Sequence, residues 1–114
     1  MQGKIFIQEA PDSLDVDDLR THLNTEGCGA IVSFIGITRE VDDGEQVLRL
    51  EFDAWQEKLT ETLSSIAEIA LERFSLHSIA MAHRTGNVGP QENIVAIHVA
   101  SPHRKEVFEG CSWL

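Results

Sequence analysis

The residues of this chain best suited to chemistry are His103 and Arg104, which follow an apolar run at residues 94–100. That run is rich in β-branched residues and predicts a strand. Ser101 and Pro102 then predict a helix start, with Ser101 as the cap and Pro102 in the first position. Cations are disfavoured at the positive end of a helix dipole. An anion held by backbone N–H groups and by these two side chains would explain them, and a solvated surface turn is the alternative.

A second candidate, Arg39, follows a strand and precedes a polar loop. Residues 30–35 are apolar on both faces, which is typical of a central strand covered on both sides. A glycine ends this strand, Ile37-Thr38-Arg39 follow, and residues 40–45 form a polar turn. Functional side chains are often placed in this way, at the end of a rigid strand beside a loop. The alternative interpretation is that Arg39 pairs with an acidic residue of the loop.

Hydrophobic periodicity predicts the elements that position these residues. The expected elements are strands at residues 4–9, 30–35, 47–52, 76–82 and 94–100, and helices at residues 15–23, at residues 53–74 and after Ser101. Their order predicts an α+β fold with a mixed or largely antiparallel sheet and two to three helices. A length of 114 residues predicts one domain over residues 1–114.

Several finer features of these elements are also expected. The strand at residues 4–9 is expected at an edge of the sheet, and Ser13 is the expected cap of the first helix. Asp53 is the expected cap of the long helix, with Gln56 three residues later as in a capping box. In the last helix, the spacing places three residues on one side. These three are Val107, Phe108 and Cys111.

The charge balance excludes some partners. A formal net charge of −10 argues against nucleic acid or an anionic membrane. Sixteen of the 19 acidic residues lie within residues 9–72, whereas residues 82–105 carry three basic residues and one acidic residue. A locally basic zone on an acidic protein suits a small anion, with chance unevenness as the alternative.

The remaining composition predicts a location and two thiols. No apolar run approaches the roughly 20 residues that a membrane helix needs, and the N-terminus lacks a signal-peptide pattern, so we expect the cytoplasm. Cys28 and Cys111 have neither metal-ligand nor redox-pair spacing. We therefore expect two reduced thiols and no metal site.

Four short motifs carry a resemblance to a known family. They are F-I-G-I-T-R at residues 34–39, L-E-F-D-A-W at residues 50–55, H-R-T-G-N-V at residues 83–88 and S-P-H-R-K-E-V-F at residues 101–108. None is specific alone. Their order and spacing together resemble the large subunit of molybdopterin synthase, the MoaE family, over about residues 4–110.

The resemblance implies a fold, partners and a reaction. It implies an α/β-hammerhead-like domain and a homodimer flanked by two copies of a small ubiquitin-like subunit, MoaD-like, in a heterotetramer. The small subunit carries a thiocarboxylate on a Gly-Gly tail. Its sulfur is transferred to cyclic pyranopterin monophosphate, giving molybdopterin for the molybdenum cofactor. No bound cofactor is implied.

The resemblance also implies roles for individual residues. Ile37, Thr38, Arg39, His103 and Arg104 resemble substrate-binding residues, and Arg39, His103 and Arg104 are the candidates for catalysis. Phe34 resembles a contact to the partner's tail. Physical chemistry fits these roles, because a guanidinium binds phosphate in a fork and histidine titrates near neutral pH.

The sequence departs from the family at its C-terminus. Family members continue into a segment with two active-site lysines, whereas Lys105 is the last lysine here. We therefore expect a C-terminally truncated domain, and three interpretations remain. The chain is a shortened enzyme, it dimerises with a different, full-length large subunit, or it is a catalytically silent homologue that binds the small subunit.

Overall fold

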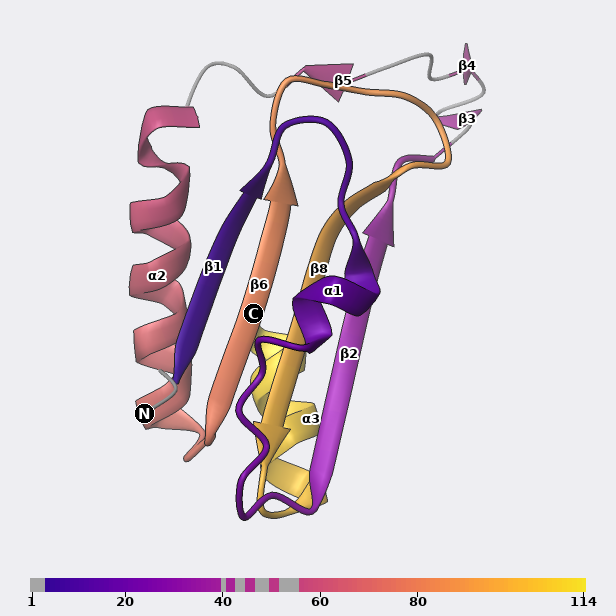
Figure 1. The fold of residues 1–114 in the computed structure, drawn as a ribbon. Helices are drawn as coiled ribbons and strands as arrows, with labels where there is room; N and C mark the ends of the chain where they lie inside the picture. The colour runs from indigo at the N-terminus through magenta and orange to yellow at the C-terminus, as the bar shows by residue number, and fades with distance from the viewer. Residues whose placement is uncertain (1–3, 40, 43–44, 47–49, 52–55) are drawn as a thin grey trace.

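A four-stranded mixed sheet organises the part of the chain that the computed structural model describes, which comprises residues 4–39, 41–42, 45–46, 50–51 and 56–114 (Figure 1). The elements in chain order are β1 (Ile5–Ala10), α1 (Val16–Arg20), β2 (Ala30–Ile37), β3 (Val41–Asp42), β4 (Glu45–Gln46), β5 (Leu50–Glu51), α2 (Gln56–Arg73), β6 (Ser78–Arg84), β7 (Asn87–Val88), β8 (Asn93–Ser101) and α3 (Arg104–Trp113). The strand order is β1-β6-β8-β2. β1 runs parallel to β6, and the other two pairs are antiparallel. The predicted α+β class is confirmed.

Helices α2 and α3 cover one face of the sheet, and α1 lies on the other (Figure 1). On the α2 and α3 side, Ile79 and Met81 of β6 and Val99 of β8 are buried against both helices. On the α1 side the sheet presents alanines, among them Ala80 and Ala96. Alternate residues of a strand face opposite sides, so small residues on one face allow the short helix α1 to approach closely.

The long helix and the edge strand β1 agree with the expectations. Helix α2 buries Leu59, Ala67 and Ala70 along one stripe, as the period of 3.6 residues predicts. Strand β1 stands at one edge of the sheet. No helix among the described residues is long and apolar enough to span a membrane.

Helix α1 is shorter than expected and has a different cap. It begins after Asp15, whose carboxylate accepts a hydrogen bond from the Asp18 N–H at 3.0 Å. The expected cap, Ser13, is therefore wrong. Both residue types can cap a helix, so the sequence pattern alone does not decide between them.

The expectation that residues 30–35 form a central strand is wrong. β2 is the other edge strand of the described sheet, and four of its large apolar residues are exposed. They are Ile31, Phe34, Ile35 and Ile37, with exposed fractions of 38%, 51%, 36% and 49%. An apolar strand predicts burial, but burial against another molecule produces the same sequence pattern.

The start of α3 also differs from the expectation. Ser101 is the last residue of β8, paired with Ala30 and 1% exposed, so it is not the helix cap. His103 occupies the cap position without a side-chain capping hydrogen bond, and α3 begins at Arg104. The turn is tight at Gly29, where a Cβ would lie 2.8 Å from the Pro102 carbonyl oxygen. The strand pairing of Ser101 thus overrides its capping propensity.

The expected buried side of α3 is correct for two residues and wrong for one. Val107 and Cys111 are buried together with Gly110, whereas Phe108 is 56% exposed. Residues four apart share a helix face, and Phe108 lies beyond the edge of that face.

Several expectations fall wholly or partly on residues outside the described ranges. Of the strand expected at residues 47–52, Leu50–Glu51 form β5, which pairs with β7. Within the loop expected at residues 40–45, β3 pairs with β4. The expected cap Asp53 lies outside the described residues.

A buried histidine links α1 to the two strands β2 and β8. His98 is 3% exposed, with ring Nε2 at 3.0 Å from the Val16 carbonyl oxygen and Nδ1 at 2.6 Å from Ser33 Oγ. A carbonyl only accepts, so Nε2 carries the proton and Nδ1 accepts from the serine hydroxyl. Burial lowers the pKa of His98, with Arg20 acting in the same direction and the Val16 hydrogen bond and Asp17 opposing it.

This lowered pKa predicts a loss of stability on mild acidification. In the unfolded chain His98 binds a proton below about pH 6.5, whereas in the folded chain it does so only at lower pH. The stability contributed by neutral His98 is therefore fully present above about pH 6.5 and is lost as the pH falls below it. We expect the free energy of unfolding to fall between about pH 7 and pH 5 more steeply in the wild type than in His98→Gln. Urea unfolding measures this slope, and parallel profiles for the two proteins would contradict the prediction.

Candidate active site

The segment Ile37-Thr38-Arg39 leaves the sheet at the C-terminal end of β2. Ile37 is paired with Asn93, after a register shift that follows Gly36, and its side chain is half exposed. Thr38 is 2% exposed, and its hydroxyl donates to the carbonyl oxygens of Gly89 and Glu92. Arg39, the next residue, is exposed. A buried, hydrogen-bonded threonine therefore fixes the backbone from which the arginine projects.

His103 and Arg104 lie at the N-terminus of α3. Both side chains are exposed, and so is Lys105. The His103 backbone is extended, with φ −127° and ψ 151°. The first N–H groups of a helix have no partner within the helix and carry a partial positive charge. This end of the sheet therefore combines three basic-type side chains with N–H donors suited to an anion.

Within one chain these two groups of candidate residues are far apart. Antiparallel pairing places Ala30 beside Ser101 and Ile37 beside Asn93. The seven residue steps of β2 between these pairs correspond to about 24 Å. Arg39 follows one end of this ladder and His103 follows the other, as the opposite directions of β2 and β8 show (Figure 1). A single chain cannot bring both groups to one phosphate.

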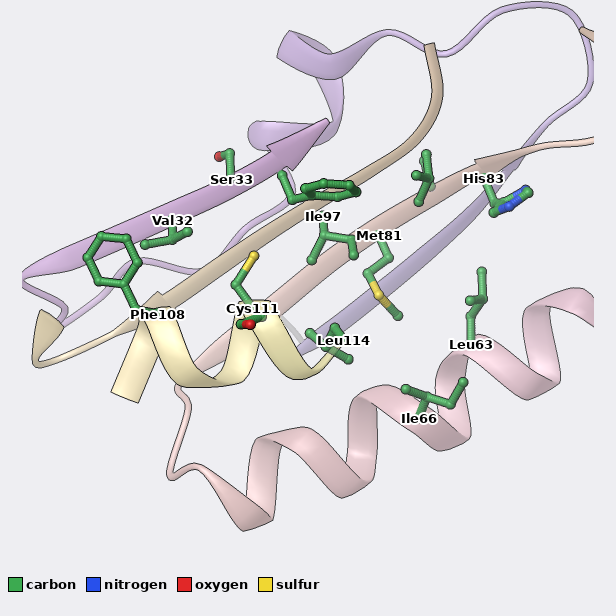
Figure 2. Close-up of a pocket in the computed structure, with 14 residues that line it drawn as sticks. Val32, Ser33, Leu63, Ile66, Met81, His83, Ile97, Phe108, Cys111 and Leu114 are labelled. Atoms are coloured by element: carbon green, nitrogen blue, oxygen red, sulfur yellow. The ribbon is translucent and has the colours of Figure 1, made fainter. Parts of the chain in front are cut away.

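An apolar groove of about 670 Å³ runs between α2 and α3 over the sheet (Figure 2). Met81 and Ile97 form part of its floor, with Leu63 of α2 on one side and Leu114 on the other. Phe34, the candidate contact for a partner's tail, also lines it. The groove extends to Val95 and His83, which pair at the sheet end that leads to Arg39.

His83 is a groove residue that the sequence reasoning did not select. It lies at one end of the groove in Figure 2, and its Nδ1 is 2.7 Å from the Arg84 carbonyl oxygen. Because a carbonyl accepts, Nδ1 carries a proton and the neutral ring keeps Nε2 as an acceptor. The motif H-R-T-G-N-V begins with His83 and was the only sequence feature that could have indicated it. Neither periodicity nor charge distinguishes this histidine from the other four.

The described residues contain no group of three histidine, cysteine or acidic side chains placed to hold a metal ion. Cys111 lines the groove, 7% exposed, and Cys28 is half-buried. Burial raises the pKa of both thiols above the ordinary value.

The fold and these candidate residues can be compared with known proteins. Residues 9–114 match the profile of the MoaE protein family. The chain belongs to the MoaE family. It is 32% identical over 110 residues to the molybdopterin synthase catalytic subunit of Ralstonia nicotianae, covering 96% of this chain and 62% of the relative. It is 36% identical over 110 residues to that of Arabidopsis thaliana, covering 96% and 56%. The chain thus spans less than two thirds of the length of these two relatives.

Solved structures agree with this assignment. The crystal structure of molybdopterin synthase from Staphylococcus aureus matches with a TM-score of 0.83 and 25% identity, covering 92% of this chain and 77% of that chain. The MoaE protein of Burkholderia ambifaria matches with a TM-score of 0.78 and 25% identity, covering 96% and 72%. A complex of subunits 1 and 2 of the molybdopterin-converting factor from Helicobacter pylori shares the fold, with a TM-score of 0.72 and 21% identity over 93% of this chain and 72% of that chain.

The burial of Cys111 in the groove wall predicts unequal thiol reactivity. Thiol alkylation requires a thiolate and access to it, so we expect iodoacetamide at pH 8 to modify Cys28 at least about tenfold faster than Cys111 in the folded protein. The variants Cys28→Ser and Cys111→Ser assign the two rates by mass spectrometry. In urea the difference should disappear. Equal rates in the folded protein would show that α3 does not shield this part of the groove.

Proposed function

We propose that this chain acts as the large subunit of a molybdopterin synthase, in which sulfur from a thiocarboxylated ubiquitin-like small subunit is transferred to cyclic pyranopterin monophosphate. The observation that carries the proposal is the course of the groove. It passes Phe34 and reaches Val95 and His83 at the sheet end where Arg39 follows β2. An extended tail in this groove delivers its terminal thiocarboxylate toward a phosphate held by Arg39.

The chemistry of the residues supports this assignment. Arg39 binds the substrate phosphate through a two-pronged set of charge-assisted hydrogen bonds. Arg104 and the N-terminus of α3 supply further donors to the anion, and His103 moves a proton as the acyl intermediate forms and collapses. The pterin is the substrate, so the reaction uses no resident cofactor. We place the reaction in the cytoplasm.

A homodimer resolves the separation between Arg39 and His103. The Ala30 end of β2 lies beside Ser101 and hence beside the start of α3. A two-fold axis perpendicular to β2 places the Arg39 end of one copy next to the Ala30 end of the other. Each composite site then takes Arg39 from one copy and His103 and Arg104 from its mate. With one small subunit for each copy the assembly is a heterotetramer.

The exposed side chains of β2 support the same dimer. Ile31, Ile35 and Ile37 share the sheet face that α1 leaves uncovered beside β8, and all three are at least 36% exposed. An apolar edge strand invites pairing or packing with another chain.

A second candidate function uses the groove and the exposed side chains of β2 for binding alone. The alternative is a catalytically silent homologue that binds the small subunit or dimerises with a full-length large subunit. Turnover assays with thiocarboxylated small subunit distinguish the two functions, because the silent homologue produces no molybdopterin.

The first test of the proposal is the oligomeric state. A stable dimer of this kind buries more than about 2,000 Å² of largely apolar surface. We expect light scattering at micromolar concentration to give a dimer for the wild type and a monomer for Ile35→Asp. Ile69→Asp is the matched control, because Ile69 is 53% exposed on α2, away from β2. A monomeric wild type would contradict the homodimer.

The second test is substrate binding. Removing one charge-assisted hydrogen-bond donor to phosphate costs roughly 1.5–3 kcal/mol, so Arg39→Ala and Arg104→Ala should each weaken binding of cyclic pyranopterin monophosphate by about one to two orders of magnitude. Calorimetry measures the dissociation constants. Arg73→Ala is the control, because Arg73 contacts the Phe74 and Trp113 rings instead. Unchanged binding in both Arg39→Ala and Arg104→Ala would rule out the site.

Mixing these two variants tests whether the site is shared between copies. A dimer of one Arg39→Ala chain and one Arg104→Ala chain contains one intact site and one doubly altered site. After random exchange about a quarter of all sites are intact, and high-affinity binding returns to that extent. No recovery on mixing would show that the residues do not act across the dimer.

The third test concerns the groove. A tail that lies along Phe34 covers the wall that contains Cys111. Saturating small subunit should therefore lower the alkylation rate of Cys111 further and leave the rate of Cys28 unchanged. A small subunit lacking its last residues is the control. Equal alkylation of Cys111 with and without the tail would place the tail elsewhere.

A further inference from the structure

The backbone before Arg39 is held by the loop at residues 89–92. The Thr38 N–H donates to the Glu92 carbonyl oxygen at 3.0 Å, and the Gln91 N–H donates to the Thr38 carbonyl oxygen at 3.0 Å. The Thr38 hydroxyl donates to the Glu92 carbonyl oxygen at 3.2 Å and to that of Gly89. Every polar group of Thr38 is therefore bonded to this loop.

The loop is held in turn by the Glu92 carboxylate. One carboxylate oxygen accepts the Gly89 N–H, and the other accepts Nη1 of Arg84 at 3.0 Å. The hydrogen bond from Gly89 and the Arg84 guanidinium lower the pKa of Glu92, so the carboxylate stays ionised at neutral pH. Glu92 thus closes the loop whose carbonyl groups bind Thr38.

Arg84 connects this loop to the end of β1. Its side chain is almost fully buried, and its Nε donates to the Ala10 carbonyl oxygen at 3.0 Å, with Nη2 at 3.5 Å from the Pro11 carbonyl oxygen. A buried charge is costly unless it is paired and hydrogen-bonded, and this guanidinium has both kinds of partner. Only an arginine fork offers donors in these several directions.

We propose that Arg84 and Glu92 are positioning residues for Arg39, acting through the loop at residues 89–92 and Thr38. This inference rests on the proposed function in one respect, namely that the anion bound by Arg39 is the substrate phosphate. Together, Arg84, Glu92 and the loop at residues 89–92 join the ends of β1, β6 and β2 at the point where Arg39 leaves the sheet. In this role neither Arg84 nor Glu92 needs to contact the substrate.

The physical reason is the geometry of phosphate binding. A guanidinium binds phosphate strongly only when two of its N–H groups align with two oxygens. Small displacements of a binding group lose much of this energy. A residue that fixes the backbone one position before Arg39 therefore changes affinity without contacting the ligand.

The test is a double-mutant cycle between Glu92→Gln and Arg39→Ala. Glu92→Gln keeps the side-chain shape and removes the charge that orders the loop. We expect calorimetry to show about tenfold weaker binding of cyclic pyranopterin monophosphate in the otherwise wild-type protein, and a change below about twofold when Arg39 is already alanine. Equal effects in both backgrounds would overturn the inference, because the substitution would not act through Arg39.

The hydroxyl of Thr38 offers a second variant with a conservative rescue. Thr38→Val removes the two hydroxyl hydrogen bonds and should weaken binding about five- to tenfold, whereas Thr38→Ser keeps them and should restore most of the affinity. The matched controls are Glu9→Gln and Thr60→Val, because Thr60 donates to the Glu9 carboxylate at 2.8 Å on the exposed surface. Urea unfolding of each variant verifies that the fold persists.

A substrate-free measurement separates this inference from the proposed function. In protein with ¹⁵N-labelled arginine, the Nε–Hε signal of Arg39 should shift or broaden in Glu92→Gln and stay in place in Glu9→Gln. If the pterin does not bind and this signal still responds, the proposed function fails and the positioning role stands. An unchanged Arg39 signal in Glu92→Gln would overturn the positioning role whatever the ligand.

Discussion

The antiparallel pairing of β2 with β8 determines what the rest of this structure can do. It places Ala30 beside Ser101 and Ile37 beside Asn93, so the segments that leave the two strands depart at opposite ends. Arg39 and the His103–Arg104 pair are therefore separated by the length of a strand, about 24 Å. No rotation of side chains closes this distance. Any single site that uses both groups requires a second chain.

The edge position of β2 and its apolar composition also favour association with a second chain. An edge strand normally carries charges or is covered, because exposed N–H and C=O groups together with apolar side chains promote association. β2 instead exposes isoleucines on one face and Phe34 on the other. Residues 9–114 match the MoaE family. In the proposed synthase this exposed surface is the interface between the two copies. In the proposed dimer the same strand that separates the two groups within a chain brings them together between chains.

Sequence reasoning predicted the elements whose burial is supplied by the chain itself. Helix α2 and strands β6 and β8 were expected near their observed positions, because periodicity reports local amphipathicity directly. Two of the errors, the edge position of β2 and the placement of Ser101, concern features set by distant partners. Strand pairing with Ala30 holds Ser101 in the sheet, and no local pattern contains that information. Arg39, His103 and Arg104 were identified from their positions at predicted strand and helix ends, and the other site residues from short motifs. The Arg84–Glu92 pair, in contrast, depends on a loop conformation that periodicity does not encode.

The pairing of Arg84 also refines the electrostatic argument from composition. Composition predicts a basic zone over residues 82–105, but Arg84 is buried and paired with Glu92, so it contributes little to the field outside the protein. The exposed basic-type residues after β6 in the described chain are His103, Arg104 and Lys105 at the start of α3, and Arg39 lies at the other end of β2. Acidic residues dominate α1 and α2. The field that attracts an anion therefore has two separate sources in one chain, which is the distribution that a two-fold assembly combines into two equivalent sites.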